Sequence, residues 1–237
     1  INLKKKFPKK NLISMLNQLK NFIKKLKQKK ITTVWENYST SNTYKESEER
    51  EKAEIVKNFI DNNIMPRIID LGCNDGFYSK IAMRNDINYV VGLDYDPISI
   101  DRAFNTFGNK QKNFLPLIFD ATNPSANIGW NESERKSFNK RALFDGLLAL
   151  AFEHHLAIAK NIPLENTVNW LLSLAPKGLI EFVPKKDETI QKMLKFKGDI
   201  FPNYSEENFK SLIEKKARII SIKEVTSSGR KIYQYEK

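Results

Sequence analysis

The feature that most constrains the fold is a regular alternation of short apolar runs with helical patterns, which begins at residue 67. Because helical stretches lie between most of these runs, the pattern predicts an α/β protein with a mostly parallel sheet. The predicted strands are Arg67–Leu71, Tyr89–Leu93, Leu115–Phe119, Leu143–Leu150, Gly178–Val183, Arg218–Val225 and Lys231–Tyr235. The last two are joined by Thr226-Ser-Ser-Gly229, a spacing that favours an antiparallel hairpin at the sheet edge.

Helix signals flank this region. Apolar residues at helical spacing predict a helix over Ser47–Asn62, with Val56, Phe59 and Ile60 among the inward-facing side chains. Ser205 is the expected N-cap of a later helix, because serine hydroxyls accept hydrogen bonds from the first free backbone N–H groups.

The charge of the chain is concentrated at its amino end. The net charge is +12, but residues 1–30 hold 11 of the 40 basic residues and no acid, which leaves 29 basic against 28 acidic residues elsewhere. Leu12, Leu16, Leu19 and Ile23 recur at three- and four-residue steps, so residues 1–30 are predicted to form a basic amphipathic helix. This helix suits an anionic surface, either lipid headgroups or RNA. The alternative is that its apolar stripe packs on the domain or on a partner.

The rest of the composition narrows the class of protein. A length of 237 residues suits one domain with an appendage, here residues 31–237 after the basic helix. One cysteine and two histidines offer neither a disulfide framework nor a metal site, and no run is long enough to cross a bilayer. The absence of a secretory signal pattern makes a reducing, cytoplasmic setting the expectation.

The most informative motif is the turn after the first predicted strand, Asp70-Leu-Gly-Cys-Asn-Asp-Gly76. In an open α/β sheet, ligands bind outside the carboxyl ends of the strands. Gly72 permits a tight turn and a close approach of the backbone to a ligand, and Gly76 lets the next helix begin close to the strand. The motif therefore predicts a ligand site at this turn.

Two further acids end the next two predicted strands. Asp94 follows the glycine turn at about the distance where a carboxylate binds a ribose diol. Asp120, followed by Ala121, ends the third strand on the same edge, where it could bind an adenine amine. The three strand ends together predict a nucleoside-like ligand.

The residues of the turn restrict which ligand this is. A dinucleotide site favours Gly-x-Gly-x-x-Gly, and a phosphate-binding loop favours lysine. This turn instead holds Asp70 and Asp75 and no lysine, which suits a cationic ligand without phosphates. S-adenosylmethionine, with a sulfonium, an ammonium, a ribose and an adenine, meets that requirement.

These three motifs resemble the first three motifs of the class I S-adenosylmethionine-dependent methyltransferases. The resemblance implies a Rossmann-like, seven-stranded, mostly parallel sheet with a C-terminal antiparallel hairpin, and S-adenosylhomocysteine as product. Asn74 stands where the family usually has a glycine, and asparagine tolerates left-handed backbone angles better than most residues. The residues assigned to the cofactor are Asp70, Gly72, Cys73, Asn74, Gly76, Asp94, Tyr95, Asp120, Ala121 and Leu150. Cys73 is interpreted as a small turn residue, because flanking acids disfavour a reactive thiolate.

A closer resemblance covers roughly residues 34–237. Many short blocks in the same order are similar to the nodulation-protein (NoeA-type) methyltransferase group. They include Trp35-Glu-Asn-Tyr38, Asn123-Pro-Ser125, Gly129-Trp130, His154-His-Leu-Ala-Ile158, Asn161-Ile-Pro-Leu164 and Glu181-Phe-Val-Pro-Lys185. The resemblance implies a methyltransferase fold without defining an acceptor, and it leaves the lysine-rich segment outside.

Candidate catalytic residues follow the fourth predicted strand, whose end faces the transferred methyl in the class I family. His155 or His154 could take a proton from a hydroxyl or amine acceptor, because histidine titrates near neutrality, and Glu153 is a rival base. The alternative is that the two histidines have a structural role only, capping a helix or packing in the core.

Candidate acceptor-binding residues are more scattered. Residues 122–141 form a long connection, which is typical of a lid, and contribute Trp130 and Arg135. Glu181 on the fifth strand, and Tyr38 in an N-terminal helical cap over residues 31–62, complete the set. The alternatives are that residues 122–141 are only a surface insertion, and that the aromatic residues of the N-terminal cap pack in a core.

Three functions remain open on the sequence. The first is methyl transfer to a small molecule or glycan precursor, favoured because the domain itself is nearly neutral. The second is RNA methylation, with the lysine-rich helix as the RNA contact. The third is a binding module that keeps the fold and the cofactor but not the chemistry.

Overall fold

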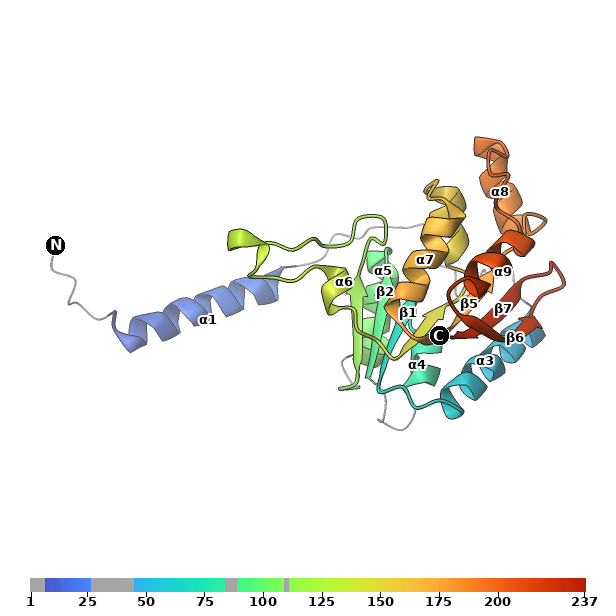
Figure 1. The fold of residues 1–237 in the computed structure, drawn as a ribbon. Helices are drawn as coiled ribbons and strands as arrows, with labels where there is room; N and C mark the ends of the chain where they lie inside the picture. The colour runs from blue at the N-terminus through green and yellow to red at the C-terminus, as the bar shows by residue number, and fades with distance from the viewer. Residues whose placement is uncertain (1–6, 27–44, 84–88, 109–110) are drawn as a thin grey trace. The chain divides into compact units, whose positions relative to one another are not determined.

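The computed structural model describes residues 7–26, 45–83, 89–108 and 111–237. The chain divides into two compact units, residues 1–32 and 33–237. In the first unit, the described residues form one helix, α1 (Lys9–Lys25). The second unit is built on a seven-stranded sheet (Figure 1).

The sheet has the strand order β3-β2-β1-β4-β5-β7-β6. The strands are β1 (Arg67–Leu71), β2 (Tyr89–Asp94), β3 (Phe114–Ile118), β4 (Gly146–Ala149), β5 (Lys177–Phe182), β6 (Arg218–Glu224) and β7 (Lys231–Glu236). The first five pair in parallel, whereas β7 runs antiparallel to both β5 and β6. The predicted sheet and its C-terminal hairpin are therefore confirmed.

The helices and helical turns connect these strands. They are α3 (Glu46–Asp61), α4 (Phe77–Ala82), α5 (Pro97–Ala103), η2 (Phe104–Gly108), η3 (Trp130–Glu132), α6 (Phe138–Arg141), η4 (His155–Ala159), α7 (Leu164–Leu174), α8 (Glu188–Lys197) and α9 (Glu206–Glu214). Helix α9 begins where predicted, because the Ser205 hydroxyl accepts a hydrogen bond from the Asn208 N–H at 3.2 Å.

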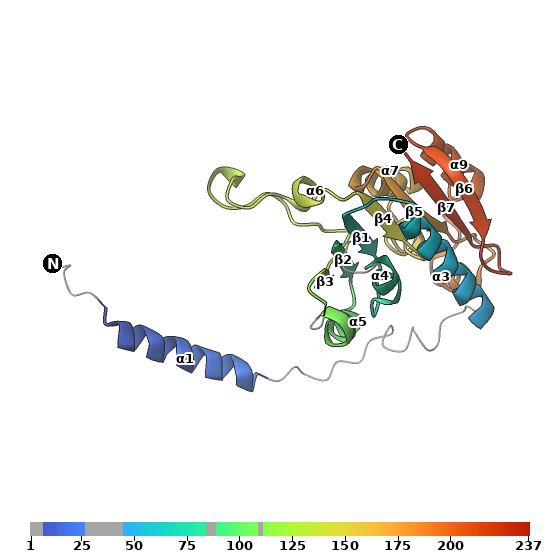
Figure 2. The same ribbon diagram turned by 90° about the horizontal axis from the view of Figure 1, so that it is seen from below.

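Two apolar cores lie on the two faces of the sheet, as expected for strands buried on both sides. Along β1, Ile69 and Leu71 face one core, which α7 and α9 cover, while Ile68 faces the other. The second core is covered by α3 and α4, to which α3 contributes Val56, Phe59 and Ile60. Figure 2 shows the two layers of helices on either side of the strands.

One predicted strand differs from the strand observed. The fourth strand begins at Gly146 rather than Leu143, because the Leu143 side chain is 63% exposed and its N–H bonds to Arg141 O. Residues 122–141 extend away from the sheet in both views and carry only η3 and α6 (Figures 1 and 2). Phe138 of α6 anchors this segment by packing between Phe119 and Trp170.

Candidate cofactor site

The turn between β1 and α4 brings the backbone to the edge of the sheet. Gly72 has φ +72°, and a Cβ at this position would lie 2.9 Å from Phe152, so both backbone angle and space favour glycine. The Gly72 N–H bonds to Leu93 O at 2.8 Å, which ties the turn to the end of β2.

Asn74 and Asp94 are joined at the centre of this edge. Asn74 has φ +50°, the left-handed conformation expected of it. Its backbone N–H donates to Asp94 Oδ2 at 2.8 Å, and the Asp96 N–H donates to Asp94 Oδ1 at 2.8 Å. Burial raises the pKa of Asp94, while these backbone hydrogen bonds oppose the rise. The two bonds fix the carboxylate in place, and a carboxylate has further lone pairs for a ligand.

Asp120 lies beyond the end of β3 and is held by a local turn. The Thr122 hydroxyl and N–H both donate to its Oδ1, at 2.6 and 2.9 Å. These bonds lower the pKa of Asp120, so the carboxylate is ionised at neutral pH.

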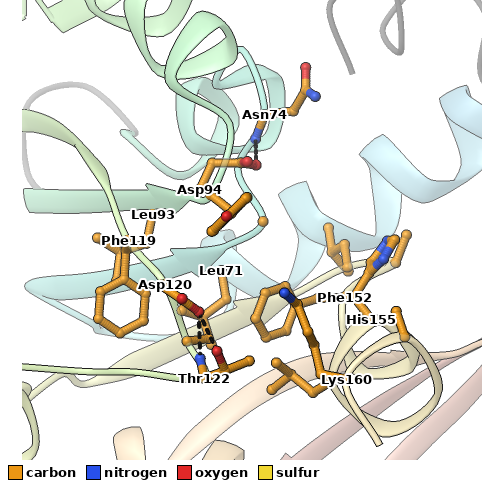
Figure 3. A pocket seen from close by; sticks show the side chains of 17 residues that line it. Leu71, Asn74, Leu93, Asp94, Phe119, Asp120, Thr122, Phe152, His155 and Lys160 are labelled. Carbon is orange, nitrogen blue, oxygen red and sulfur yellow. Dashed lines mark hydrogen bonds between the residues drawn. The ribbon is translucent and has the colours of Figure 1, made fainter. Parts of the chain in front are cut away.

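A cavity of about 310 Å³ lies between these strand ends and the segment after β4. That volume lies at the lower end of the range of ~300–1,000 Å³ that is usual for small-molecule sites. Figure 3 shows Asn74, Asp94 and Asp120 on one side of it and Phe152, His155 and Lys160 on the other. One wall of the cavity thus carries two carboxylates and an amide, and the other carries two aromatic rings and the Lys160 ammonium.

The structure brings most of the residues predicted for the cofactor to this cavity. Those that line it are Gly72, Asn74, Asp94, Tyr95, Asp120, Ala121 and Leu150. The remaining three, Asp70, Cys73 and Gly76, do not line it. All three are buried within the turn or at its ends.

Asp70 is 2% exposed and accepts a hydrogen bond from the Ser79 hydroxyl at 2.6 Å, which fastens α4 to β1. Burial raises the pKa of Asp70 to about 6. Burial and the nearby acids raise the pKa of the Cys73 thiol well above its usual value, so it is an unreactive packing residue. Gly76 takes φ +88° as the residue before α4.

Of the three candidate bases, only His155 lines the cavity. His154 is 1% exposed and stacks against His155 with ring centroids 4.2 Å apart. Burial lowers the pKa of His155 to about 4 and that of His154 well below its usual value, so both imidazoles are neutral at pH 7.

Glu153 is fully buried and does not line the cavity. Its Oε1 is 2.6 Å from the Tyr204 hydroxyl, which is also 2.7 Å from Val183 O. The same Oε1 also accepts the Val183 N–H at 3.2 Å, so Glu153 ties Tyr204 to the backbone just after β5. Burial raises the pKa of Glu153 to about 8, although the hydrogen bonds from Tyr204 and Val183 oppose the rise, so the protonated form is favoured at neutral pH. The structure therefore places Glu153 in the core rather than at the site of chemistry.

The Glu153→Gln variant tests this protonation. Because the pKa is about 8 in the folded protein and near 4.5 when unfolded, the glutamate favours folding below pH 4.5 and loses that contribution as the pH rises to 8. The stability of the variant relative to wild type should therefore increase between these pH values, as measured by urea unfolding. The exposed Glu54→Gln on α3 is the control, and an equal pH trend in both variants would contradict the assignment.

Glu181 was predicted near the acceptor, but it forms a buried ion pair instead. Its Oε2 lies 2.6 Å from Lys52 Nζ of α3, with the two side chains 0% and 2% exposed. The same oxygen accepts the Ala151 N–H at 2.9 Å, and Arg230 lies 4.0 Å from Oε1. Ala151 lines the cavity with φ +49°, an unfavourable angle for alanine. Glu181 therefore influences the cavity only indirectly, by holding the backbone N–H of Ala151 in the cavity wall.

Two other predicted acceptor residues, Trp130 and Arg135, do not line the cavity. Trp130 is 83% exposed, and Arg135 pairs with Ile128 through a backbone bridge in the extended segment. Tyr38 lies outside the described residues.

Phe152 and Lys160 are cavity residues that sequence reasoning missed. Lys160 Nζ lies 5.3 Å from the centre of the ring of Tyr95, which also lines the cavity. Phe152 directly precedes the predicted bases, and an aromatic residue just after a β4 strand end is the signal that could have identified it.

Comparison with solved structures defines the fold class. N-methyltransferase NodS from Bradyrhizobium japonicum WM9, in complex with S-adenosyl-L-homocysteine, superposes with a TM-score of 0.59 at 9% identity, covering 86% of this chain and 96% of that one. Magnesium protoporphyrin IX methyltransferase (ChlM) from Synechocystis PCC 6803, with the same molecule bound, gives 0.54 at 14% identity, covering 96% and 99%. The chain therefore has the Rossmann-like fold of class I methyltransferases.

The sequence is similar to that of a particular protein. It is 44% identical over 234 residues to the nodulation protein NoeA of Rhizobium meliloti (strain 1021), covering 98% of this chain and 49% of that protein. The predicted NoeA-type resemblance is confirmed, but it also includes most of the lysine-rich segment, which was predicted to lie outside it. The chain spans about half the length of this relative, and no protein-family model matches it.

Proposed function

We propose that the chain binds S-adenosylmethionine in the cavity at the ends of β1–β4 and transfers its methyl group to an acceptor. The observation that carries the proposal is the pair of cavity carboxylates, Asp94 and Asp120, beside a glycine turn that contains no phosphate-binding lysine. S-adenosylmethionine supplies an electrophilic methyl on a sulfonium, a cation that these carboxylates favour.

Each group of cavity residues has a distinct role in this proposal. Asp94 accepts hydrogen bonds from the ribose hydroxyls, and Asp120 with Ala121 binds the adenine side. Gly72 and Ala151 let the backbone approach the amino-acid end, and Phe152 offers a ring to the sulfonium, where a cation–π contact contributes about 0.5–2 kcal/mol. Catalysis then comes mainly from holding the acceptor in line with the methyl.

His155 is the proposed base for a hydroxyl or amine acceptor, because it is the one candidate that lines the cavity. With a pKa of about 4, it is neutral throughout the physiological range. We expect the rate of methyl transfer to show no inflection from His155 near pH 6.5, and His155→Ala to lower kcat by about 10²–10⁴-fold. A pH–rate profile of wild type and variant measures both, and an unchanged kcat would remove His155 from the chemistry.

The acceptor is proposed to be a small molecule or glycan precursor. This rests on residues 31–237, whose 29 basic and 28 acidic side chains form no strongly charged domain. A polyanionic acceptor such as RNA would instead favour a basic surface around the site.

The test is transfer of labelled methyl from S-adenosylmethionine to separate pools of small metabolites, glycans and RNA. The proposal expects label in the first or second pool and a loss of labelling in Asp94→Ala. Label confined to RNA would favour RNA methylation, in which the lysine-rich segment contacts the acceptor. Cofactor binding with no label in any pool would favour a non-catalytic binding module.

A further inference from the structure

Helix α1 separates its side chains into two faces. At about 100° per residue, seven of the large apolar residues fall on one arc of about 120°, whereas the remainder of the helix surface carries the polar residues and one further apolar residue, Ile13. The apolar face consists of Leu12, Met15, Leu16, Leu19, Phe22, Ile23 and, just after the helix, Leu26. These seven side chains are 48–62% exposed.

The opposite face carries positive charge without compensation. Lys9, Lys10, Lys20, Lys24 and Lys25 lie outside the apolar arc, and residues 1–30 contain no acid. Lys9 and Lys20 lie next to one margin of the apolar arc. A helix with these features lies in the plane of a bilayer surface, with its apolar face among the acyl chains and its lysines at anionic headgroups.

The length and charge of α1 support an in-plane orientation. Its 17 residues make a helix of about 25 Å, shorter than the ~30 Å hydrocarbon core of a bilayer. Within the described residues, no helix has the length and apolar content required to span a membrane.

We propose that α1 docks the protein on an anionic lipid bilayer. RNA would use the lysines but would leave seven large apolar side chains in water. Pairing with α1 of a second copy would cover those side chains but would bring like charges together at the margin. An anionic bilayer satisfies both faces at once. The proposal is independent of methyl transfer, because it concerns α1 alone.

The test is cosedimentation of the full chain with phosphatidylcholine vesicles that contain 0 or about 30% phosphatidylglycerol. We expect binding to the anionic vesicles to be at least about tenfold tighter, and to weaken as salt is raised, because the headgroup attraction is screened. Equal or absent binding to both vesicles would overturn the proposal.

A matched pair of variants separates the apolar face from net charge. The Leu19→Asp/Phe22→Asp double variant alters the apolar face, and Gln18→Asp/Asn21→Asp makes the same charge change on the polar face. The first variant should lose at least tenfold more affinity for the anionic vesicles than the second. Circular dichroism should show that the domain stays folded in both variants. Equal losses would overturn the proposal.

Two other results would also overturn it. One is tight, salt-sensitive binding to a single-stranded RNA that survives Leu19→Asp/Phe22→Asp, in the absence of vesicle binding. The other is a dimer in solution that the same double variant dissociates, again without vesicle binding.

Discussion

Replacing Lys52 by methionine is expected to destabilise the domain by about 3–5 kcal/mol, the usual cost of removing one partner of a buried ion pair. Methionine keeps most of the length of the side chain and its apolar packing, but it lacks the Nζ that lies 5.0 Å from the centre of the Tyr78 ring. What is lost is the 2.6 Å contact with the fully buried Glu181 carboxylate. Urea unfolding at pH 7 measures the effect.

A control on the same helix distinguishes burial from helix propensity. Arg50 pairs with Glu46 one turn away, but these side chains are 76% and 80% exposed. Arg50→Met should therefore cost less than about 1 kcal/mol. Adding Glu181→Gln to Lys52→Met should recover part of the loss, because the buried charge is then removed. Equal destabilisation by the two single methionine variants would contradict a structural role for this ion pair.

Replacing Asp94 by alanine is expected to weaken S-adenosylmethionine binding by tenfold or more. The carboxylate is proposed to accept both ribose hydroxyls, and it also holds the Asn74 and Asp96 N–H groups at 2.8 Å. Hydrogen bonds to a charged acceptor contribute about 1.5–3 kcal/mol each, so one lost bond already accounts for a tenfold effect. Calorimetric titration measures the change in Kd.

Two further variants make this result specific. Asp101→Ala removes an exposed carboxylate from the neighbouring helix α5 and should leave Kd unchanged. Asp94→Asn retains one acceptor oxygen and should fall between wild type and Asp94→Ala. Unchanged affinity in a folded Asp94→Ala protein would remove Asp94 from the ribose site.

The sheet was predictable because its signals are local. Each strand is a short apolar run, and parallel order follows from the helices between the runs. The carboxyl edge of such a sheet is a single line, so Asp94 and Asp120 could be placed beside one cavity before any coordinates were known. The left-handed angle at Asn74 was likewise predictable, because it depends on residue type.

The buried charges were not predictable, because each depends on a partner far along the chain. On the helical pattern, Lys52 is an ordinary solvated lysine, and only the packing of α3 against β5 brings it to Glu181. Glu153 shares this property, since its position against Tyr204 and Val183 decides both its burial and its proton. Sequence adjacency to His155 therefore suggested catalytic roles for Glu153 and His154 that their burial does not support.

The most direct test of the central claim is a calorimetric titration of the wild-type protein with S-adenosylmethionine and S-adenosylhomocysteine, with ATP and NAD as comparison ligands. The carboxylates of Asp94 and Asp120 and the glycine turn without lysine predict micromolar binding of the first two and no measurable binding of the phosphate-bearing ligands. Binding of ATP or NAD in preference, or no binding of either adenosyl ligand by a folded sample, would contradict the assignment of this cavity.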